Sequence, residues 1–272
     1  MNLWRPQSAC GPHCIPTGEA RVGPVRYLLR LVGAACVVLF FIVAPKRPAV
    51  VRAGARALLA VLGLSLVVRG KPRPGLLVAN HVSWVDIVIL LAVDGGVRLV
   101  SKREVGGWPV IGSLARRQGA IFVDRSAPRR LPGTVAAAAA ALRSGATVAV
   151  FPEATTTCGA CPVPLRPAFF QAAIDAVVPV TPVSLRFSAA GERSAAAAFV
   201  GDETLLASVR RLARAKGLTV TVTAAAPLHP EVAADRRALA RVASASIAAP
   251  RVTPVRLRTP VAAPVAAALL VP

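Results

Sequence analysis

Residues 75–93 read GLLVANHVSWVDIVILLAV, a short apolar run, a polar cluster and a longer apolar run. This pattern predicts a buried strand, a turn and then a helix. Ser83 suits the N-cap of the helix, and Asp86 suits its third position, as in a capping box. His81 falls in the turn, where an imidazole between apolar segments needs either a bonding partner or a chemical function.

Two interpretations of this polar cluster are open. In the first, Ser83 and Asp86 only cap the helix, and His81 is a satisfied loop histidine. In the second, Asp86 leans back along the first helical turn, reaches the imidazole and fixes its tautomer. The pair would then act as a general base on a hydroxyl or amine of a bound substrate. The chain has no GxSxG motif, which disfavours a Ser-His-Asp hydrolase.

Short strands alternate with helices after residue 70. The strand candidates are 75–79, 97–100, 119–123, 146–151, 178–184, 195–200 and 218–224, and the helix candidates are 83–92, 108–117, 128–143, 167–176, 203–215 and 230–247. This alternation predicts one α/β domain over 70–248, with a central mostly parallel or mixed sheet flanked by helices.

Two apolar stretches, 31–44 and 49–68, precede the domain. We expect a two-helix membrane-associating segment over 25–68 that either dips into one leaflet or forms a short hairpin. A cleaved signal peptide is the alternative, disfavoured because the apolar region starts late. Basic residues on both sides of the first stretch favour the cytoplasmic face of a membrane.

The composition is apolar and strongly basic. The chain has 272 residues, of which 55% are hydrophobic, and a net charge of +21. This charge favours anionic lipid headgroups, phosphorylated substrates or an acidic carrier protein as partners. Aromatic residues are only 4% and no nucleic-acid-binding motif is present, so we expect no nucleic acid. Residues 1–24 are interpreted as a disordered extension, and 249–272 as a disordered basic Pro/Ala-rich tail.

The cysteines do not suggest a disulfide framework. Cys158 and Cys161 form a Cys-x-x-Cys pair, and Cys10, His13 and Cys14 form a possible second cluster. Four such ligands can bind zinc, but neither spacing is a usual finger pattern. The sequence interpretation is therefore buried or loop thiols in a reducing cytosol, with no metal site.

Four ordered blocks resemble those of the glycerolipid acyltransferases, the family that includes 1-acylglycerol-3-phosphate acyltransferase. They are NHVSWVD (80–86, similar to NHx4D), GAIFVDR (119–125, GxxFxxR), FPEATTT (151–157, FPEGTRS) and VPVTPV (178–183, VPV). A further stretch, SKREVGGWPVIG (101–112), resembles the family's lysine-bearing segment. The resemblance covers about residues 70–185.

The resemblance implies an acyltransferase domain and a membrane-associated O-acyltransferase activity in phospholipid biosynthesis. His81 would deprotonate the acceptor hydroxyl, and Asp86 would orient His81. The implied substrate-binding residues are Lys102, Arg125, Glu153, Ala154, Thr155, Thr156 and Arg166, and the implied supporting residues are Asn80, Ser83, Gly119 (for tight packing beside the site) and Pro152. Ordinary solvated arginine is the alternative for Arg125 and Arg166, whereas Glu153 follows a buried strand, where an unpaired acid is costly.

The implied partners are a lysolipid acceptor, a membrane surface with anionic lipids, and acyl-CoA or acyl-acyl carrier protein as co-substrate. No cofactor or metal is implied. Ala154 stands where the family has Gly, and Thr156 where it has an Arg that grips phosphate. The acceptor is therefore open between 1-acylglycerol-3-phosphate, a related lysophospholipid and a non-phosphate lipid such as lyso-ornithine lipid. A non-catalytic basic membrane-binding relative is a further alternative.

Overall fold

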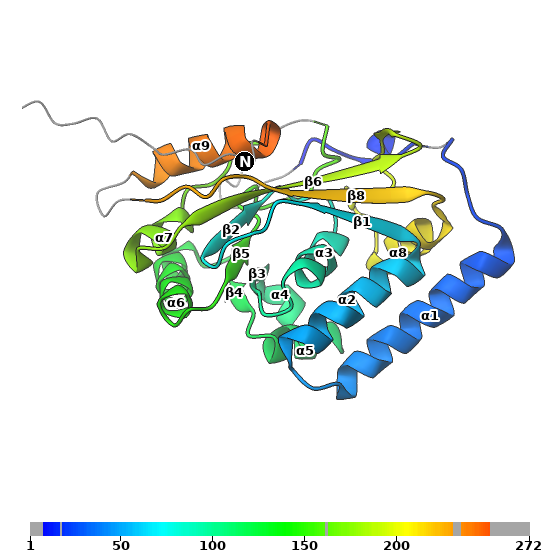
Figure 1. Ribbon diagram of the computed structural model, residues 1–272, viewed down its shortest axis with the longest axis horizontal. Helices are drawn as coiled ribbons and strands as arrows, with labels where there is room; N and C mark the ends of the chain where they lie inside the picture. Colours follow the sequence, from blue (N-terminus) through cyan, green and yellow to red (C-terminus); the bar gives the residue numbers. More distant parts are fainter. Residues whose placement is uncertain (1–7, 17, 161–162, 231–234, 251–272) are drawn as a thin grey trace, which may run out of the picture.

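The computed structural model describes residues 8–16, 18–160, 163–230 and 235–250, and a mixed sheet forms its centre (Figure 1). Its strands are β1 (Leu64–Arg69), β2 (Leu76–Ala79), β3 (Arg98–Lys102), β4 (Ile121–Val123), β5 (Val148–Val150), β6 (Val180–Ala189), β7 (Glu192–Arg193) and β8 (Leu218–Ala224). The order across the sheet is β1-β8-β6-β2-β5-β3-β4, and β7 pairs with β6. The pairs β6–β2, β2–β5, β5–β3 and β3–β4 are parallel, as is β1–β8, whereas β6 is antiparallel to β8 and to β7.

Helices cover both faces of the sheet. They are α1 (Pro24–Val43), α2 (Pro48–Leu62), α3 (Val85–Val93), α4 (Arg103–Gly106), α5 (Ile111–Arg117), α6 (Leu131–Arg143), α7 (Phe170–Ala176), α8 (Leu205–Arg214) and α9 (Arg236–Ala248), with 3-10 turns at Pro12–Cys14 and Pro128–Arg130. Along β2, Leu77 and Ala79 face a core shared with α2, α3 and α8, while Leu76 and Val78 face α6, α7 and α9. This alternation places α9 and α2 on opposite faces (Figure 1). The predicted α/β class with a mixed sheet is confirmed.

The apolar stretch 49–68 was predicted to be one helix, but its last residues form a strand instead. Gly63 has φ 81 and ends α2 in the left-handed conformation that glycine adopts without steric cost. The next six residues form β1, which runs in register beside β8 from Leu64↔Leu218 to Arg69↔Thr223. Helix α2 itself buries Leu59 and Leu62 in the core. It belongs to the domain, so the expected pair of membrane helices reduces to α1.

The predicted strand 195–200 is also wrong. These residues form a largely buried loop, in which the Ala198 amide donates to Ala195 O at 2.9 Å. The Phe199 amide donates to Val82 O at 2.9 Å, so the loop pairs with the turn after β2 instead of with a strand. Four consecutive alanines are apolar enough to suggest a buried strand, but they carry no β-branched side chains.

Several predicted helices begin later than expected. The helix predicted over 108–117 is α5, which begins at Ile111, and the other late starts are at Leu131, Phe170, Leu205 and Arg236. The short helix α4 lies before this stretch and was not predicted. Residues 231–234 of the last predicted helix and 251–272 of the predicted tail lie outside the described residues.

The described part of the N-terminal segment contacts the domain, in contrast to the disordered extension that we expect from its composition. The Val22 amide donates to Arg214 O at 2.9 Å, and the Lys216 amide donates to Ala20 O at 3.0 Å. The Ser194 hydroxyl donates to Glu19, and Cys10 lies against Cys158. These contacts are made by backbone groups and scattered side chains, which leave no periodic signal in the sequence.

Candidate active site

His81 and Asp86 lie together at the C-terminal end of β2. The Nδ1 atom of His81 is 2.9 Å from Oδ2 of Asp86. The same carboxylate oxygen accepts hydrogen bonds from the amides of Val82, at 2.6 Å, and Ser83, at 2.8 Å. Asp86 is fully buried and His81 is partly exposed. A carboxylate at Nδ1 keeps the proton on that nitrogen, which leaves a lone pair on Nε2.

The contacts expected from each interpretation of the polar cluster are both present. Asp86 caps the first turn of α3 through the Ser83 amide, as the acidic residue of a capping box does. It also contacts the imidazole, as expected from side chains that lean toward the helix N-terminus. The reciprocal half of the capping box is weak, because the buried Ser83 hydroxyl accepts only from the Val85 amide, at 3.4 Å.

Residues after β5 hold His81 from the other side. The Phe151 ring stacks on the imidazole, with centroids 4.1 Å apart and planes inclined by 15°. The His81 amide donates to Oε2 of Glu153 at 3.0 Å, and the Thr157 amide donates to His81 O at 2.9 Å. The contact with Phe151 was not anticipated from the sequence, although the residue opens one of the four blocks. An aromatic side chain directly after a strand, near a functional turn, is the signal that points to it.

Asn80 ties the end of β2 to β6. Its side chain donates to Leu185 O at 3.0 Å, and its Oδ1 accepts from the Leu185 amide at 2.7 Å. The backbone ladder between these strands ends at Ala79↔Val183. The amide side chain thus continues the pairing by one step, directly before His81.

Glu153 is the perturbed acid of the site. It is 6% exposed. Burial raises the pKa of its carboxyl to about 7, against the lowering effect of the His81 amide, and the nearby negative charge of Asp86 raises it further. Its contact with the His81 backbone makes Glu153 a link between the end of β5 and the turn after β2, beside the acceptor-site role that the resemblance implies.

The predicted basic residues lie at the ends of neighbouring strands. Lys102 ends β3, and its Nζ lies 5.5 Å from the centroid of the Trp108 ring. Arg125 follows β4, and burial lowers the pKa of its guanidinium; Glu104 raises this pKa and Arg166 lowers it. Arg125 and Arg166 are therefore close enough to repel each other. Among the described residues, no carboxylate forms an ion pair with Arg125.

The neighbouring Asp124 does not neutralise Arg125, because other arginines surround it. Arg103 Nη1 donates to Asp124 Oδ2 at 2.7 Å, and Arg130 Nη1 is 3.7 Å from the same oxygen. Arg125 is thus available to an anion.

The residues after Glu153 form a tight turn. Ala154 has φ 58, a left-handed conformation that a Cβ atom disfavours. The Thr156 hydroxyl donates to Phe199 O, so this side chain fastens the loop at 195–200. Thr155 is half-buried, and buried Pro152 accepts the Arg166 amide at 2.9 Å. The Thr156 hydroxyl therefore already donates a structural hydrogen bond, and it cannot donate the same proton to a bound substrate.

Gly119 has a different role from the one expected. It has φ 77 and lies just after α5, where its amide donates to Arg116 O at 3.0 Å. A Cβ atom there would lie 3.4 Å from the Arg98 side chain. The left-handed turn that leads into β4 therefore requires a glycine. Close packing beside the site, which was the expected reason, is not what requires it.

Comparison with known proteins places these residues in one family. A family model described as Acyltransferase matches residues 65–186. A 1-acyl-sn-glycerol-3-phosphate acyltransferase of Neisseria meningitidis is 36% identical over 190 residues, which cover 68% of this chain and 73% of the relative. A lyso-ornithine lipid O-acyltransferase of Pseudomonas aeruginosa is 36% identical over 208 residues, covering 75% of this chain and 79% of the relative.

The fold is similar to a solved structure as well. The crystal structure of the 1-acyl-sn-glycerophosphate acyltransferase PlsC from Thermotoga maritima matches with a TM-score of 0.60 and 19% identity, covering 82% of this chain and 92% of that one. The ordered blocks, the histidine-aspartate pair at a strand end and the two relatives with similar sequences lead to the same conclusion. The chain belongs to the acyltransferase family that includes the 1-acyl-sn-glycerol-3-phosphate acyltransferases.

Proposed function

We propose that this acyltransferase moves a fatty acyl group from an acyl thioester to the hydroxyl of a lysolipid, at a membrane surface, with His81 as the general base. The observation that carries the proposal is the 2.9 Å contact between His81 Nδ1 and Asp86, at the end of a buried parallel strand. Catalytic groups of α/β sheets gather at such strand ends.

The chemistry follows from the tautomer. His81 Nε2 takes the proton of the acceptor hydroxyl as its oxygen attacks the thioester carbonyl. The carbon–sulfur bond then breaks, and the leaving thiolate takes the proton back from the imidazolium, so protons and charge balance. Asp86 stabilises the imidazolium between these steps. General base catalysis of this kind contributes roughly 10²–10⁴-fold to the rate.

The acceptor carries an anionic group in this proposal. Arg125 lies half-buried at the end of β4 with Arg166 nearby, and two guanidinium groups that repel each other gain from a shared anion. A phosphate satisfies this requirement, and so does the carboxylate of an amino-acid lipid. Arg125→Ala should raise KM for an anionic acceptor more than the matched change Arg129→Ala, at an exposed arginine.

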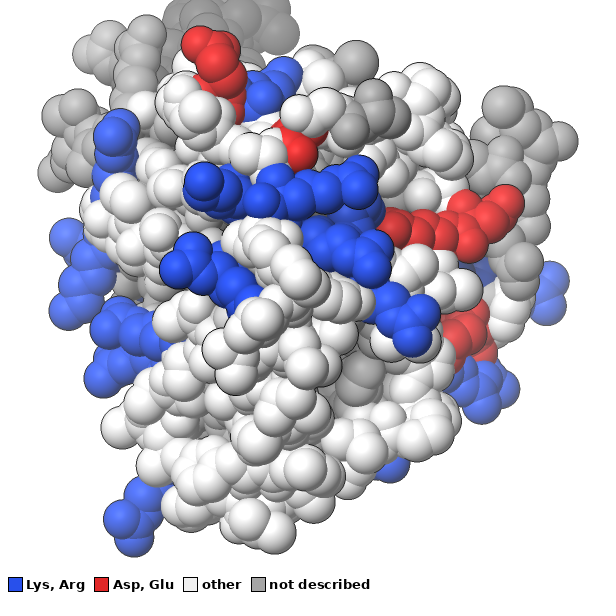
Figure 2. All heavy atoms as spheres, turned by 90° about the vertical axis from the view of Figure 1, so that its right-hand side faces the viewer, with Lys and Arg blue, Asp and Glu red and all other residues white. Residues whose placement is uncertain are grey.

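The membrane surface is proposed from α1. This helix has a mean hydropathy of 2.1 in its best window and is long enough to cross a membrane, and Ala34 is its buried residue. Its exposed large apolar residues are Val25, Leu28, Leu29, Val32, Leu39, Phe40, Ile42 and Val43, most of which recur at helical spacing. Figure 2 shows an extended uncharged area below a group of Lys and Arg side chains, on the side where α1 lies. Such a combination suits an anionic lipid surface.

The orientation of α1 favours lying in the interface over crossing it. Arg30 Nη1 donates to Ala213 O at 3.0 Å and to Ala215 O at 2.6 Å, which fastens the helix to the end of α8. Phe41 packs so closely on Gly54 of α2 that a Cβ atom there would overlap its ring. One face of α1 is thus occupied by the domain, and the other is left for lipid. We place the domain on the cytoplasmic face.

The test is acyl transfer by purified full-length protein, with labelled acyl-CoA or acyl-acyl carrier protein. His81→Ala should lose at least about 10²-fold in kcat/KM, whereas His229→Gln, at an exposed histidine, should match the wild type. A fully active His81→Ala protein overturns the mechanism. No transfer to any lysolipid by folded, vesicle-bound wild type overturns the function and favours a non-catalytic membrane-binding protein.

Lyso-ornithine lipid is the second candidate acceptor. Thr156 stands where the family has an arginine that binds phosphate, so the site has one cationic group fewer for a phosphate. The Thr156 hydroxyl donates a hydrogen bond to Phe199 O instead. The Pseudomonas aeruginosa relative, named for that acceptor, matches over a larger share of the chain than the Neisseria one. Parallel assays with lysophosphatidic acid, lysophosphatidylethanolamine and lyso-ornithine lipid rank the acceptors by kcat/KM.

A further inference from the structure

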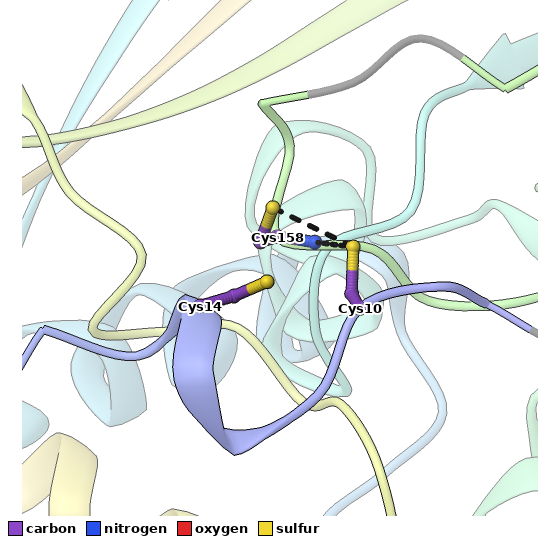
Figure 3. Close-up of side chains that lie close together, drawn as sticks. All are labelled: Cys10, Cys14 and Cys158. Carbon is purple, nitrogen blue, oxygen red and sulfur yellow. Dashed lines mark hydrogen bonds between the residues drawn. The ribbon is translucent and has the colours of Figure 1, made fainter.

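Three cysteines from two distant segments meet beside the active-site loop. Cys10 and Cys14 come from the N-terminal segment, and Cys158 follows the loop after β5 (Figure 3). Their Sγ atoms all lie within 4.8 Å of one another, and Cys10 and Cys158 are 3.5 Å apart. His13, which the sequence grouped with them, is not in this group; its ring lies beside Gly11.

These separations suit a single thiophilic ion. Two sulfurs bound to one tetrahedral Zn²⁺, with Zn–S bonds of about 2.3 Å, lie about 3.8 Å apart. The observed separations, 3.5 Å between Cys10 and Cys158 and at most 4.8 Å within the group, lie within about 1 Å of that value. A disulfide, by contrast, joins only two sulfurs, at about 2.05 Å, and gives no reason for a third to be present.

The local backbone supports a ligand cluster. The Cys14 amide donates to Gly11 O at 2.9 Å, which closes a 3-10 turn directly after Cys10. The sulfurs of Cys10 and Cys14 both point toward Cys158 (Figure 3). The Cys158 amide donates to the Cys10 sulfur at 3.4 Å. An amide hydrogen bond of this kind supports a metal-bound thiolate by neutralising part of its charge.

We propose that Cys10, Cys14 and Cys158 bind a Zn²⁺ ion that fastens the N-terminal segment to the loop carrying the acceptor-site residues. Zinc is assigned because three thiolates around one tetrahedral position select it over harder cations. The ion is structural and takes no part in acyl transfer. It replaces the sequence-based expectation that these are independent thiols.

The proposed ion acts on the active site through a short path. The Gly159 amide donates to the Thr157 hydroxyl at 3.2 Å, and the Thr157 amide in turn donates to His81 O. A fixed Cys158 therefore fixes the segment that supports the His81 backbone. Loss of the ion should loosen this loop and lower the thermal stability of the protein.

The experiment measures zinc, independently of acyl transfer. Full-length protein purified under reducing conditions is analysed for zinc per chain, and its affinity is measured by competition with a chromophoric chelator. We expect about one equivalent in the wild type, and an affinity at least tenfold weaker in Cys10→Ser and Cys158→Ser. Cys36→Ser is the matched control, since Cys36 is an exposed thiol on α1, and it should bind like the wild type.

Two results overturn the proposal. One is wild-type zinc affinity no higher than that of a Cys10→Ser/Cys158→Ser double variant. The other is a Cys10–Cys158 disulfide, detected by alkylation and mass spectrometry, in protein taken from reducing cytosol. Charge-transfer bands on Co²⁺ substitution that disappear in Cys14→Ser would support thiolate ligation. Cys161 lies outside the described residues; weaker binding by Cys161→Ser would identify a fourth ligand in addition to the three.

Discussion

At the scale of single residues, one oxygen atom of Asp86 has three tasks. Oδ2 accepts two backbone amides and contacts the His81 imidazole, while Oδ1 has no hydrogen-bond partner among the described residues. Asp86→Asn can keep the accepting oxygen in place but loses the charge that stabilises an imidazolium. We expect kcat/KM to fall by roughly 10²–10⁴-fold, with the fold retained.

The control for this change lies at the other end of the same helix. Asp94 follows α3, and its Oδ1 accepts the Gly96 amide at 2.9 Å. Asp94→Asn should leave kcat/KM within about twofold of the wild type. Equal losses in both variants, measured on protein with unchanged circular dichroism, would show that the charge of Asp86 is not specifically required.

Glu153 predicts a pH dependence of stability. Its folded pKa, raised to about 7 mainly by burial, exceeds the unfolded value near 4.5. Between these values the unfolded chain releases a proton that the folded chain keeps, so the free energy of unfolding falls as pH rises. The loss amounts to about 3 kcal/mol by pH 8.

Glu153→Gln removes this ionisation while retaining a carbonyl for the His81 amide. Its free energy of unfolding should therefore change less than that of the wild type between pH 5 and pH 8, as measured by chemical denaturation at both values. Glu192→Gln, at an exposed glutamate in β7, should follow the wild-type profile. Parallel profiles for the wild type and Glu153→Gln would exclude a raised pKa at this site.

Ala154, which stands where the family has glycine, has a strained backbone conformation. Its φ of 58 costs about 1–2 kcal/mol for a residue with a Cβ atom. Ala154→Gly removes this strain but adds about 0.4–1 kcal/mol of unfolded-state entropy. We expect a small net stabilisation in thermal denaturation. Ala136→Gly, at an exposed position in the middle of α6, should instead destabilise by about 1 kcal/mol.

At the scale of secondary structure, local patterns predicted most elements where turn residues separate them. The segment from β2 to α3 was predictable because one strand, one turn and one capped helix follow directly in the sequence. β1 was not, because its apolar residues continue the pattern of α2 and only pairing with β8 distinguishes them. The contact of Asp86 with His81 is local and was predicted, whereas the thiol cluster joins segments 148 residues apart.

The pairing of β2 with β6 through Asn80 predicts a loss of stability when this side chain is removed. It exchanges two hydrogen bonds with the Leu185 backbone, at the point where the ladder between β2 and β6 ends. Asn80→Ala leaves a donor and an acceptor of β6 without their partner, which costs about 2–4 kcal/mol. The same change should lower kcat, because His81 is the next residue. Full stability in urea denaturation would show that the side-chain pairing is dispensable.

At the scale of the whole molecule, topology assembles the site. The blocks that carry His81, Lys102, Arg125 and Glu153 are separated in sequence, but each follows one of the parallel strands β2, β3, β4 and β5. Their C-terminal ends share one edge of the sheet, so the ordered motifs converge there without further specification. What the sequence did not reveal is that α2 packs in the domain core, because an apolar helix that faces a core and one that faces lipid have similar sequences.

The exposed stripe of α1 therefore provides the last prediction. Leu28 is 60% and Leu39 is 62% exposed, and both lie on the face of α1 that the domain leaves uncovered. Each leucine inserted into lipid contributes about 1.5–3 kcal/mol, so Leu28→Ser/Leu39→Ser should weaken binding to anionic vesicles by at least about 10²-fold. Val177→Ser, at a 64% exposed residue beside α7, is the control and should bind like the wild type.

Flotation with phosphatidylglycerol vesicles measures this binding, and the same variants report on catalysis. If α1 only delivers the enzyme to its substrate, the double variant should keep the wild-type kcat on a lysolipid dispersed in detergent, while its rate on vesicle-embedded acceptor falls with its binding. Unchanged flotation of the double variant would mean that α1 does not contact lipid. Loss of activity in both assays would instead assign α1 a role in holding α2 and α8, on which its other face packs.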